Sequence, residues 1–174
     1  MFTFVTGGLR SGKSAYALRR ASELGPPPWL YVGTSFDGDA DIKQRLARSR
    51  RDQDAIWTIV EAPAHLGAAL EAERLVGHGA VVVDGFSVWL SNRLSVGPKV
   101  SEGELLRDVE ALAERMYRST VPSVLVTTEI GLGFMPHALT DRGFLDVAGL
   151  ANQVMAERAQ TVVLMVSGVA LRLR

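Results

Sequence analysis

Short apolar runs alternate along the chain with longer segments of mixed polarity, and this pattern predicts strands separated by helices. Six runs predict buried strands: residues 2–6, 29–32, 57–60, 80–84, 123–127 and 161–166. The run at 80–84 is apolar on both faces, which is typical of a central strand in a parallel sheet. Gly168 ends the last run, and residues 169–174 are predicted to turn back as a short edge piece.

The segments between these runs carry the signals of helices. Predicted helices cover residues 14–24, 41–51, 64–75, 101–119 and 144–159. Ser101-Glu102-Gly103-Glu104 has the form of a capping box, so one helix is expected to begin there. Strands that alternate with helices indicate an α/β fold with a mostly parallel, doubly wound sheet, while the order of the strands stays open.

The composition excludes several classes of function. The 174 residues, 47% of them hydrophobic, fit one domain with a full core. Nineteen basic residues balance nineteen acidic ones, which argues against binding to nucleic acid or to an anionic membrane surface. The chain has no cysteine, which excludes disulfides, thiolate catalysis and Cys-ligated zinc or iron–sulfur sites. No apolar stretch approaches the about 20 residues of a membrane span and the first residues lack a charged signal-peptide region, so a cytoplasmic protein is expected.

The strongest chemical signal is a glycine-rich loop directly after the first predicted strand. Gly7-Gly8-Leu9-Arg10-Ser11-Gly12-Lys13-Ser14 fits the phosphate-loop pattern G-x-x-x-x-G-K-[ST]. Glycines let backbone N–H groups wrap a phosphate, and the helix that follows adds its positive end. Lys13 is expected to reach the terminal phosphates of ATP or GTP, and the Ser14 hydroxyl to bind Mg²⁺. Residues 1–174 are therefore expected to form a single P-loop nucleotide-binding domain.

Asp84 ends the predicted central strand, at the position where P-loop enzymes carry a second ligand for Mg²⁺. An acid at a strand end also serves, in many proteins, only to cap the following turn. The phosphate loop in the same chain favours the metal role for Asp84, with Lys13 as its catalytic partner.

Three blocks of sequence, the loop included, resemble one enzyme family, the bifunctional adenosylcobinamide kinase/adenosylcobinamide-phosphate guanylyltransferases of cobalamin assembly. Residues 6–14 are similar to the family's TGGxRSGKS, and residues 83–94 to its D-x-[LIV]-[ST]-x-[WL]-[LV]-[ST]-N-x-L. The third block, similar to VTNEVGxGIVP…RxFRDxxGxxNQ, consists of residues 126–136 with Arg142, Phe144, Asp146, Gly149, Asn152 and Gln153. Tyr31-Val32-Gly33-Thr34-Ser35 resembles the family's YIATS.

The resemblance implies a two-step enzyme. It would phosphorylate adenosylcobinamide, a corrinoid, with a nucleoside triphosphate, and then transfer GMP from GTP to the new phosphate. It also implies a homotrimer whose active sites lie between subunits. The nucleotide contacts that it implies are Gly7, Gly8, Leu9, Arg10, Ser11, Gly12, Lys13, Ser14, Gly33, Thr34, Ser35, Arg50, Arg51, Asp52, Gln53, Glu61 and Asp84.

One position departs from the family pattern. The family carries GMP on a histidine of the helix after the second strand, and Ser49 occupies that place here, within an arginine-rich segment expected to hold polyphosphate charge. A serine hydroxyl is a far weaker nucleophile than neutral imidazole, so the covalent step is not expected at Ser49. The chain has three histidines, His65, His78 and His137, none at the family position; His137 is the best placed of the three as a substitute.

Two other interpretations stay open at this stage. A phosphate loop also serves kinases that act on other small alcohols, and a nucleotide-binding subunit that has lost catalysis can retain one. The complete set of Lys13, Ser14 and Asp84 argues against lost catalysis, because an inactive site has no chemical need for both phosphate and metal ligands.

Overall fold

The structure is a computed structural model that describes residues 1–36, 57–95, 100–131 and 139–174. Its strands are β1 (Phe2–Gly7), β2 (Trp29–Gly33), β3 (Trp57–Glu61), β4 (Ala80–Asp84), β5 (Ser123–Val126), β6 (Thr161–Val166) and β7 (Val169–Arg172). Its helices are α1 (Lys13–Leu24), α3 (Leu66–Ala69), α4 (Ala72–Leu75), α5 (Phe86–Ser95), α6 (Glu102–Arg118) and α7 (Leu139–Arg158).

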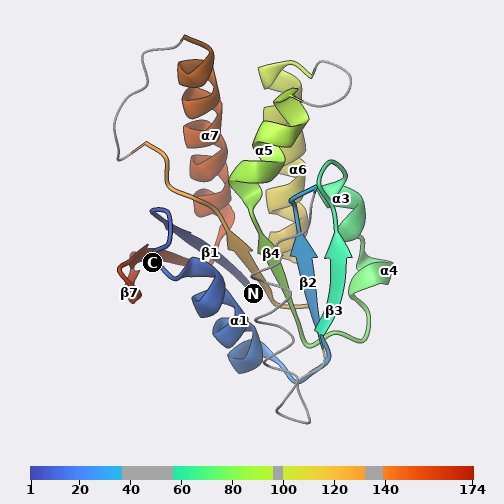
Figure 1. The fold of residues 1–174 in the computed structure, drawn as a ribbon. Helices are drawn as coiled ribbons and strands as arrows, with labels where there is room; N and C mark the ends of the chain where they lie inside the picture. The colour runs from blue at the N-terminus through green and yellow to red at the C-terminus, as the bar shows by residue number, and fades with distance from the viewer. Residues whose placement is uncertain (37–56, 96–99, 132–138) are drawn as a thin grey trace.

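The seven strands form one sheet in the order β3-β2-β4-β5-β1-β6-β7 (Figure 1). Neighbouring strands from β3 to β6 run parallel, and β7 returns antiparallel beside β6. The carboxyl ends of the parallel strands therefore meet at one edge, which is where open α/β sheets bind ligands. The predicted α/β fold with a mostly parallel sheet is confirmed.

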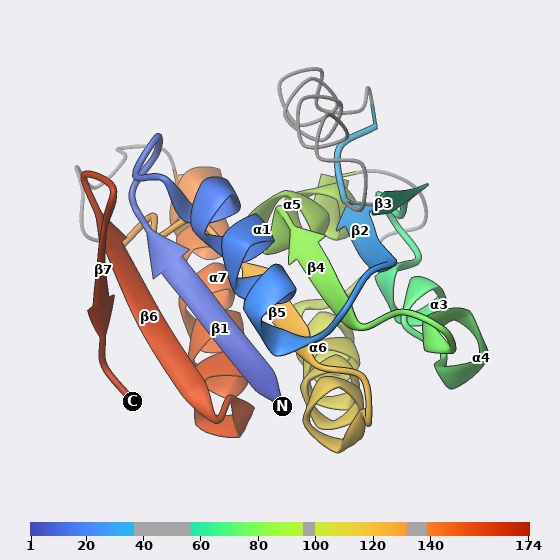
Figure 2. The ribbon, with the colours of Figure 1, turned by 90° about the horizontal axis from the view of Figure 1, so that it is seen from below.

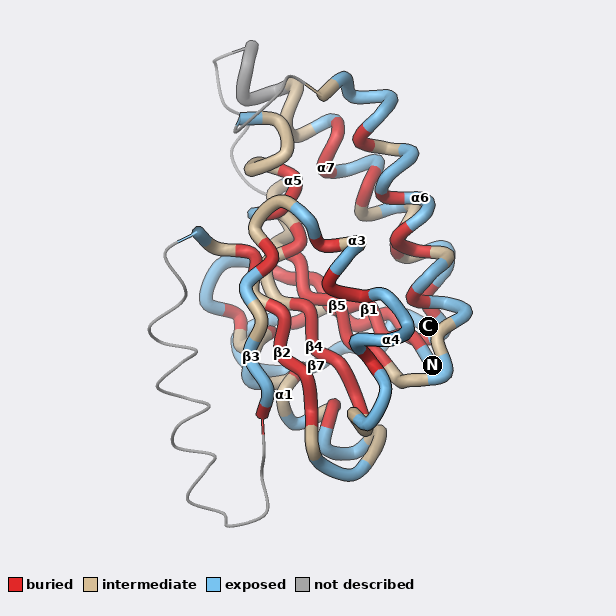
Figure 3. Tube along the Cα trace, turned by 90° about the vertical axis from the view of Figure 1, so that its right-hand side faces the viewer, coloured by how far each residue is buried: buried red, intermediate tan, exposed pale blue. Residues whose placement is uncertain are grey.

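Helices cover both faces of this sheet (Figure 2), as the doubly wound prediction requires. On one face, Ala17 and Ala21 of α1 are buried in a cluster with Val82 of β4. On the other face lie α5, α6 and α7, and Leu105 and Met155 are fully buried there in the larger core. Figure 3 shows that the central strands are buried along their length, whereas the edge strand β3 carries exposed positions.

The six predicted strands are all present, and the predicted edge piece is β7. The sequence pattern did not indicate α5, which follows β4 after a single residue, and α7 begins at Leu139 rather than at residue 144. The predicted helix at 41–51 lies outside the described residues. In the part of the chain that the structure describes, no helix is both long and apolar enough to cross a membrane.

The single helix predicted over residues 64–75 is wrong, because two short helices occupy this segment. Glu71, between α3 and α4, has the extended backbone angles φ −65° and ψ 145°. On one continuous helix, Leu75 would lie about 180° around the axis from Leu66, since each residue advances 100°. Both side chains are buried. The break at Glu71 therefore lets both leucines reach the same core.

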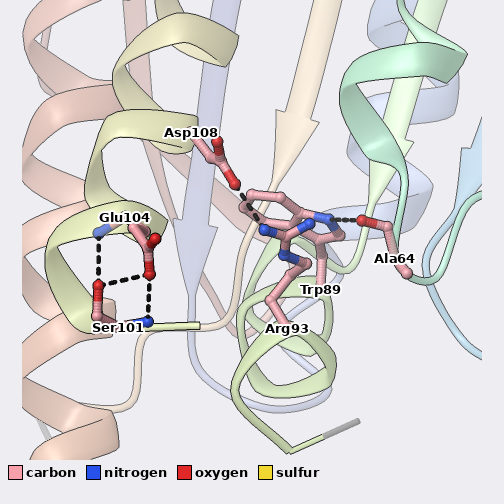
Figure 4. Close-up of polar contacts among 6 residues, drawn as sticks. All are labelled: Ala64, Trp89, Arg93, Ser101, Glu104 and Asp108. Atoms are coloured by element: carbon pink, nitrogen blue, oxygen red, sulfur yellow. Dashed lines mark hydrogen bonds and ion pairs between the residues drawn. The ribbon is translucent and has the colours of Figure 1, made fainter. Parts of the chain in front are cut away.

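Helix α6 begins at the predicted capping box (Figure 4). The Glu104 backbone N–H donates to the Ser101 hydroxyl oxygen at 3.3 Å, and the Ser101 backbone N–H donates to the Glu104 carboxylate at 2.9 Å. The Ser101 hydroxyl donates to the same carboxylate at 2.7 Å. The two bonds that the carboxylate accepts hold the pKa of Glu104 below its usual range, and the bond from the Ser101 hydroxyl has the larger effect.

Replacing the cap tests this assignment. Ser101→Ala is expected to lower the free energy of unfolding by about 1 kcal/mol, because an N–H of the first turn loses its acceptor. Urea denaturation measures this change, and Ser22→Ala, at an exposed position inside α1, should cause no such loss.

Glu104→Ala is expected to be less stable than the wild type at neutral pH. This difference in the free energy of unfolding should vanish as the pH falls through the lowered pKa of Glu104, since only the ionised carboxylate is favoured by folding. A deficit that persists unchanged in acid would contradict this account.

Candidate active site

The predicted phosphate loop lies between β1 and α1, at the carboxyl edge of the sheet. Arg10 and Gly12 adopt positive φ values of 57° and 94°, and the Ser11 N–H donates to the Gly8 carbonyl at 3.3 Å. The Tyr16 N–H donates to the Gly12 carbonyl at 3.0 Å and starts α1. The loop is thus a tight turn that leads directly into a helix N-terminus, as the motif predicts.

The turn between β6 and β7 supports this loop. The Gly168 N–H donates to the Ser11 carbonyl at 2.9 Å. A Cβ at Gly12 would lie 3.3 Å from the Gly168 Cα, and the φ of Gly12 is in the region that L side chains rarely adopt. Glycine at position 12 is therefore required both by its backbone conformation and by the close approach of the turn.

The Lys13 side chain folds back over the loop. Its Nζ donates to the carbonyls of Gly7 at 2.9 Å and Gly8 at 2.6 Å, and the residue is 8% exposed. Burial lowers the pKa of Lys13, while the negative charge of Asp84 acts in the opposite direction. Asp84, at the end of β4, therefore acts electrostatically on Lys13 at the start of α1.

More of the residues predicted to contact nucleotide lie at the ends of three neighbouring strands. In the sheet register, Gly33 of β2 lies opposite Glu61 of β3 on one side and opposite Asp84 of β4 on the other. Thr34 and Ser35 follow Gly33 at the same edge. The described residues that were predicted to contact nucleotide thus all lie at the carboxyl edge, in the phosphate loop or at the ends of β2, β3 and β4.

Helix α5 fixes two of the loops at this edge. The Asn92 Nδ2 donates to the Thr34 carbonyl at 2.8 Å and to the Pro63 carbonyl at 3.1 Å, so one amide joins the loops after β2 and β3. The Thr34 hydroxyl donates to the Gly85 carbonyl at 2.7 Å. Gly85 has φ +97°, and a Cβ there would lie 2.4 Å from the Thr34 Oγ1, so only glycine fits.

Trp89 and Arg93 of α5 also hold neighbouring segments in place (Figure 4). The Trp89 Nε1 donates to the Ala64 carbonyl at 3.1 Å. The Arg93 guanidinium lies over the Trp89 ring, 5.9 Å from its centroid, and pairs with Asp108 of α6 at 2.6 Å. Helix α5 therefore ties the loop after β3 to the layer formed by α6.

The donor chemistry of Ser14 and Asp84 fits the predicted Mg²⁺ site. Both offer oxygen atoms, a hydroxyl and a carboxylate, which are the ligands that Mg²⁺ prefers. Ser14 follows Lys13 at the start of α1, and Asp84 acts electrostatically on Lys13. Within the described residues, no cluster of three or more His, Cys, Asp or Glu side chains forms a metal site of another kind.

Several predicted site residues lie outside the described part of the chain: Ser49, Arg50, Arg51, Asp52, Gln53 and His137. His65 is exposed and precedes α3. His78 lies beside Thr58 near the start of β3, with 3.4 Å between the His78 Nε2 and the Thr58 Oγ1. This is the amino edge of the sheet, so His78 is not positioned to replace a nucleophile at the carboxyl edge.

Two polar contacts at the site were not predicted as functional. The Tyr31 hydroxyl donates to the Asp84 Oδ2 at 3.1 Å. The Thr127 hydroxyl donates to the Asn152 Oδ1 at 3.2 Å and joins the end of β5 to α7. All four residues belong to the sequence blocks that resemble the family. That membership is the only sign in the sequence that could have indicated a functional role for these two contacts.

The Asn92 attachment can be tested by a matched pair of variants. Asn92→Ala removes the donor from two carbonyls, and we expect a loss of about 1–3 kcal/mol in the free energy of unfolding. Asn92→Asp keeps the shape but replaces the donor by an acceptor, so it should destabilise at least as much at neutral pH. Chemical denaturation measures both. Wild-type stability in Asn92→Asp would show that shape, not donation, matters at this position.

Comparison with known proteins agrees with this geometry. The family model "Cobinamide kinase / cobinamide phosphate guanyltransferase" matches residues 3–173. The bifunctional adenosylcobalamin biosynthesis protein CobP of Pseudomonas aeruginosa is 35% identical over 175 residues, which cover 100% of this chain and 98% of that protein. The CobU proteins of Salmonella typhimurium and Escherichia coli are each 29% identical over 184 residues and are covered completely, as is this chain.

Among solved structures, a crystal structure of the RadB recombinase aligns with 94% of this chain and 73% of its own, with a TM-score of 0.49 and 13% identity. The matches to the family model and to CobP and CobU support the interpretation as a cobalamin-biosynthesis enzyme, a kinase and guanylyltransferase, and do not support the alternatives of another alcohol kinase or an inactive subunit. The chain belongs to the cobinamide kinase / cobinamide phosphate guanyltransferase family.

Proposed function

We propose that this chain phosphorylates adenosylcobinamide with ATP or GTP bound at the carboxyl edge of the sheet. The observation that carries the proposal is the buried Lys13 ammonium, which donates to two carbonyls of the phosphate loop and is influenced by the charge of Asp84. In this step a hydroxyl oxygen of the substrate bonds to the γ-phosphorus, and the bond from that phosphorus to the β–γ bridging oxygen breaks. The nucleoside diphosphate leaves with the electron pair, and the hydroxyl proton is released.

The loop residues have distinct roles in this proposal. The backbone N–H groups of residues 8–14 and the N-terminus of α1 bind the phosphates. The Lys13 ammonium, now bound to two carbonyls, exchanges one of them for a phosphate oxygen and balances the charge that develops during transfer. Arg10, at a positive φ in the same loop, and the segment Gly33–Ser35 complete the contacts to nucleotide.

Ser14 and Asp84 would hold Mg²⁺ in the same site. The ion, when bound, neutralises part of the phosphate charge. The chain's own contribution is to fix the two oxygen ligands on rigid elements, one at the start of α1 and one at the end of β4.

For the second step we propose direct transfer of GMP from GTP to the cobinamide phosphate. An oxygen of that phosphate bonds to the α-phosphorus, the bond to the α–β bridging oxygen breaks, and pyrophosphate leaves. Ser49 stands where the resemblance implies a histidine, and its hydroxyl is a poor nucleophile at neutral pH. In this proposal Arg50, Arg51, Asp52, Gln53 and Glu61 contact the nucleotide.

The family resemblance also supports an assembly and a location. We propose that the chain works as a homotrimer in the cytoplasm, with its corrinoid and nucleotide substrates bound between subunits. The balanced charge of the sequence, 19 basic against 19 acidic residues, supports small-molecule substrates rather than a nucleic-acid partner.

Lys13→Ala tests the kinase assignment. We expect phosphate transfer from γ-labelled nucleotide to adenosylcobinamide to fall by at least about 100-fold, because a charge that stabilises the transition state is removed. Arg20→Ala, at the exposed Arg20–Glu23 pair of α1, is the control and should keep wild-type activity. Full activity in Lys13→Ala would overturn the phosphate-loop assignment. Tight nucleotide binding by the wild type without transfer would indicate a binding subunit instead.

The second step has a separate test with α-labelled GTP. We expect labelled GMP on the corrinoid phosphate and no acid-labile GMP on the protein, since Ser49 does not form the covalent intermediate. Ser49→His should gain the acid-labile label, which makes it a positive control for detection. Acid-labile GMP on the wild-type protein would contradict direct transfer.

A further inference from the structure

Tyr31 is buried in β2, yet its single polar side-chain atom reaches the carboxyl edge of the sheet. The residue is 4% exposed and packs on the face covered by α1, in the cluster that contains Val82. Its hydroxyl donates to the Asp84 Oδ2 at 3.1 Å. A buried phenol needs hydrogen-bond partners, and one of them here is the carboxylate proposed to hold Mg²⁺.

The sequence of β2 makes this reach geometrically feasible. Tyr31 lies opposite Val82, and Gly33 lies opposite Asp84, so the phenol must extend along the strand by two residues to meet the carboxylate. Gly33 shares the face of Tyr31, because side chains alternate along a strand. A Cβ at Gly33 would lie 3.4 Å from the Tyr31 Cε1. The tyrosine ring therefore lies over a position without a side chain, and its hydroxyl arrives beside Asp84.

The contact joins two neighbouring strands at the catalytic edge. The hydroxyl donates to the Oδ2 of the Asp84 carboxylate, and this bond restricts rotation of the Asp84 side chain. Asp84 follows Val82 by two residues and so faces α1, the helix that begins with Lys13 and Ser14. The phenol thus orients the carboxylate on the face where the phosphate loop lies.

We propose that Tyr31 is a positioning residue whose hydroxyl holds the Asp84 carboxylate in the orientation that binds a divalent cation with its nucleotide. This inference rests on the proposed function, because it takes Asp84 as a ligand of the ion. Tyr31 touches neither nucleotide nor substrate in this account. Groups that orient metal-ligating carboxylates typically change metal affinity by 10–100-fold when they are removed.

Tyr31→Phe removes the hydroxyl and keeps the ring. The measurement is Mn²⁺ binding to the protein saturated with GTP, followed by the electron paramagnetic resonance signal of free Mn²⁺. We expect the dissociation constant for Mn²⁺ to rise about tenfold, and the affinity for GTP measured in EDTA to stay at the wild-type value. Tyr117→Phe, at an exposed tyrosine of α6, is the matched control and should change neither quantity.

The EDTA measurement distinguishes positioning from general damage. A loss of metal-free GTP affinity in Tyr31→Phe, equal to its loss of Mn²⁺ affinity, would mean that Tyr31 only supports the fold, and the proposal would be overturned. Unchanged Mn²⁺ affinity in Tyr31→Phe would overturn it as well.

A third variant separates this inference from the proposed function. If Asp84→Asn weakens Mn²⁺ binding and Tyr31→Phe does not, the inference about Tyr31 fails while Asp84 remains a metal ligand. If Asp84→Asn binds Mn²⁺ with GTP as tightly as the wild type, the metal role of Asp84 fails, and the inference about Tyr31 fails with it.

Discussion

An ammonium group withdrawn from water must be surrounded by acceptors, and the phosphate loop meets this requirement at Lys13. Two loop carbonyls, of Gly7 and Gly8, accept its hydrogen bonds, so the loop is folded around its own positive charge. Asp84 favours the charged form of this lysine against the effect of burial. These bonds and the charge of Asp84 connect the phosphate loop, the start of α1 and the end of β4 through one side chain.

Helix α5 gives the rest of the edge its rigidity. Trp89, Asn92 and Arg93 are spaced at i, i+3 and i+4, so they share one side of the helix. Trp89 and Asn92 donate to carbonyls in the loops after β2 and β3, and Arg93 pairs with Asp108 of α6. The loops that carry several proposed nucleotide contacts are thereby attached to a helix that packs in the core, rather than left to their own conformational freedom.

Most of the fold could be predicted because buried strands leave a local signal, a short run of apolar residues. Helix α5 could not, since the inward polar residues Asn92 and Arg93 make contacts across the fold and interrupt its apolar pattern. The break at Glu71 depends on where the core lies relative to Leu66 and Leu75, which a local pattern does not record. In the site, the phosphate loop was predictable from contiguous residues. The contact of Tyr31 with Asp84 was not, because it needs the pairing of β2 with β4, and strand order is a property of the whole sheet.

Strand β1 precedes the other described strands in the sequence, yet both of its partners lie far along the chain. Its two neighbours, β5 and β6, come from the second half of the chain, and Gly168, which supports the phosphate loop, lies beyond both. Contacts between such distant segments are slow to form, because a long loop must close before they gain any energy. The loop at residues 7–14 is therefore enclosed by segments that are far from it in the sequence. A chain that ends before Gly168 therefore lacks the hydrogen bond that supports the phosphate loop at Ser11.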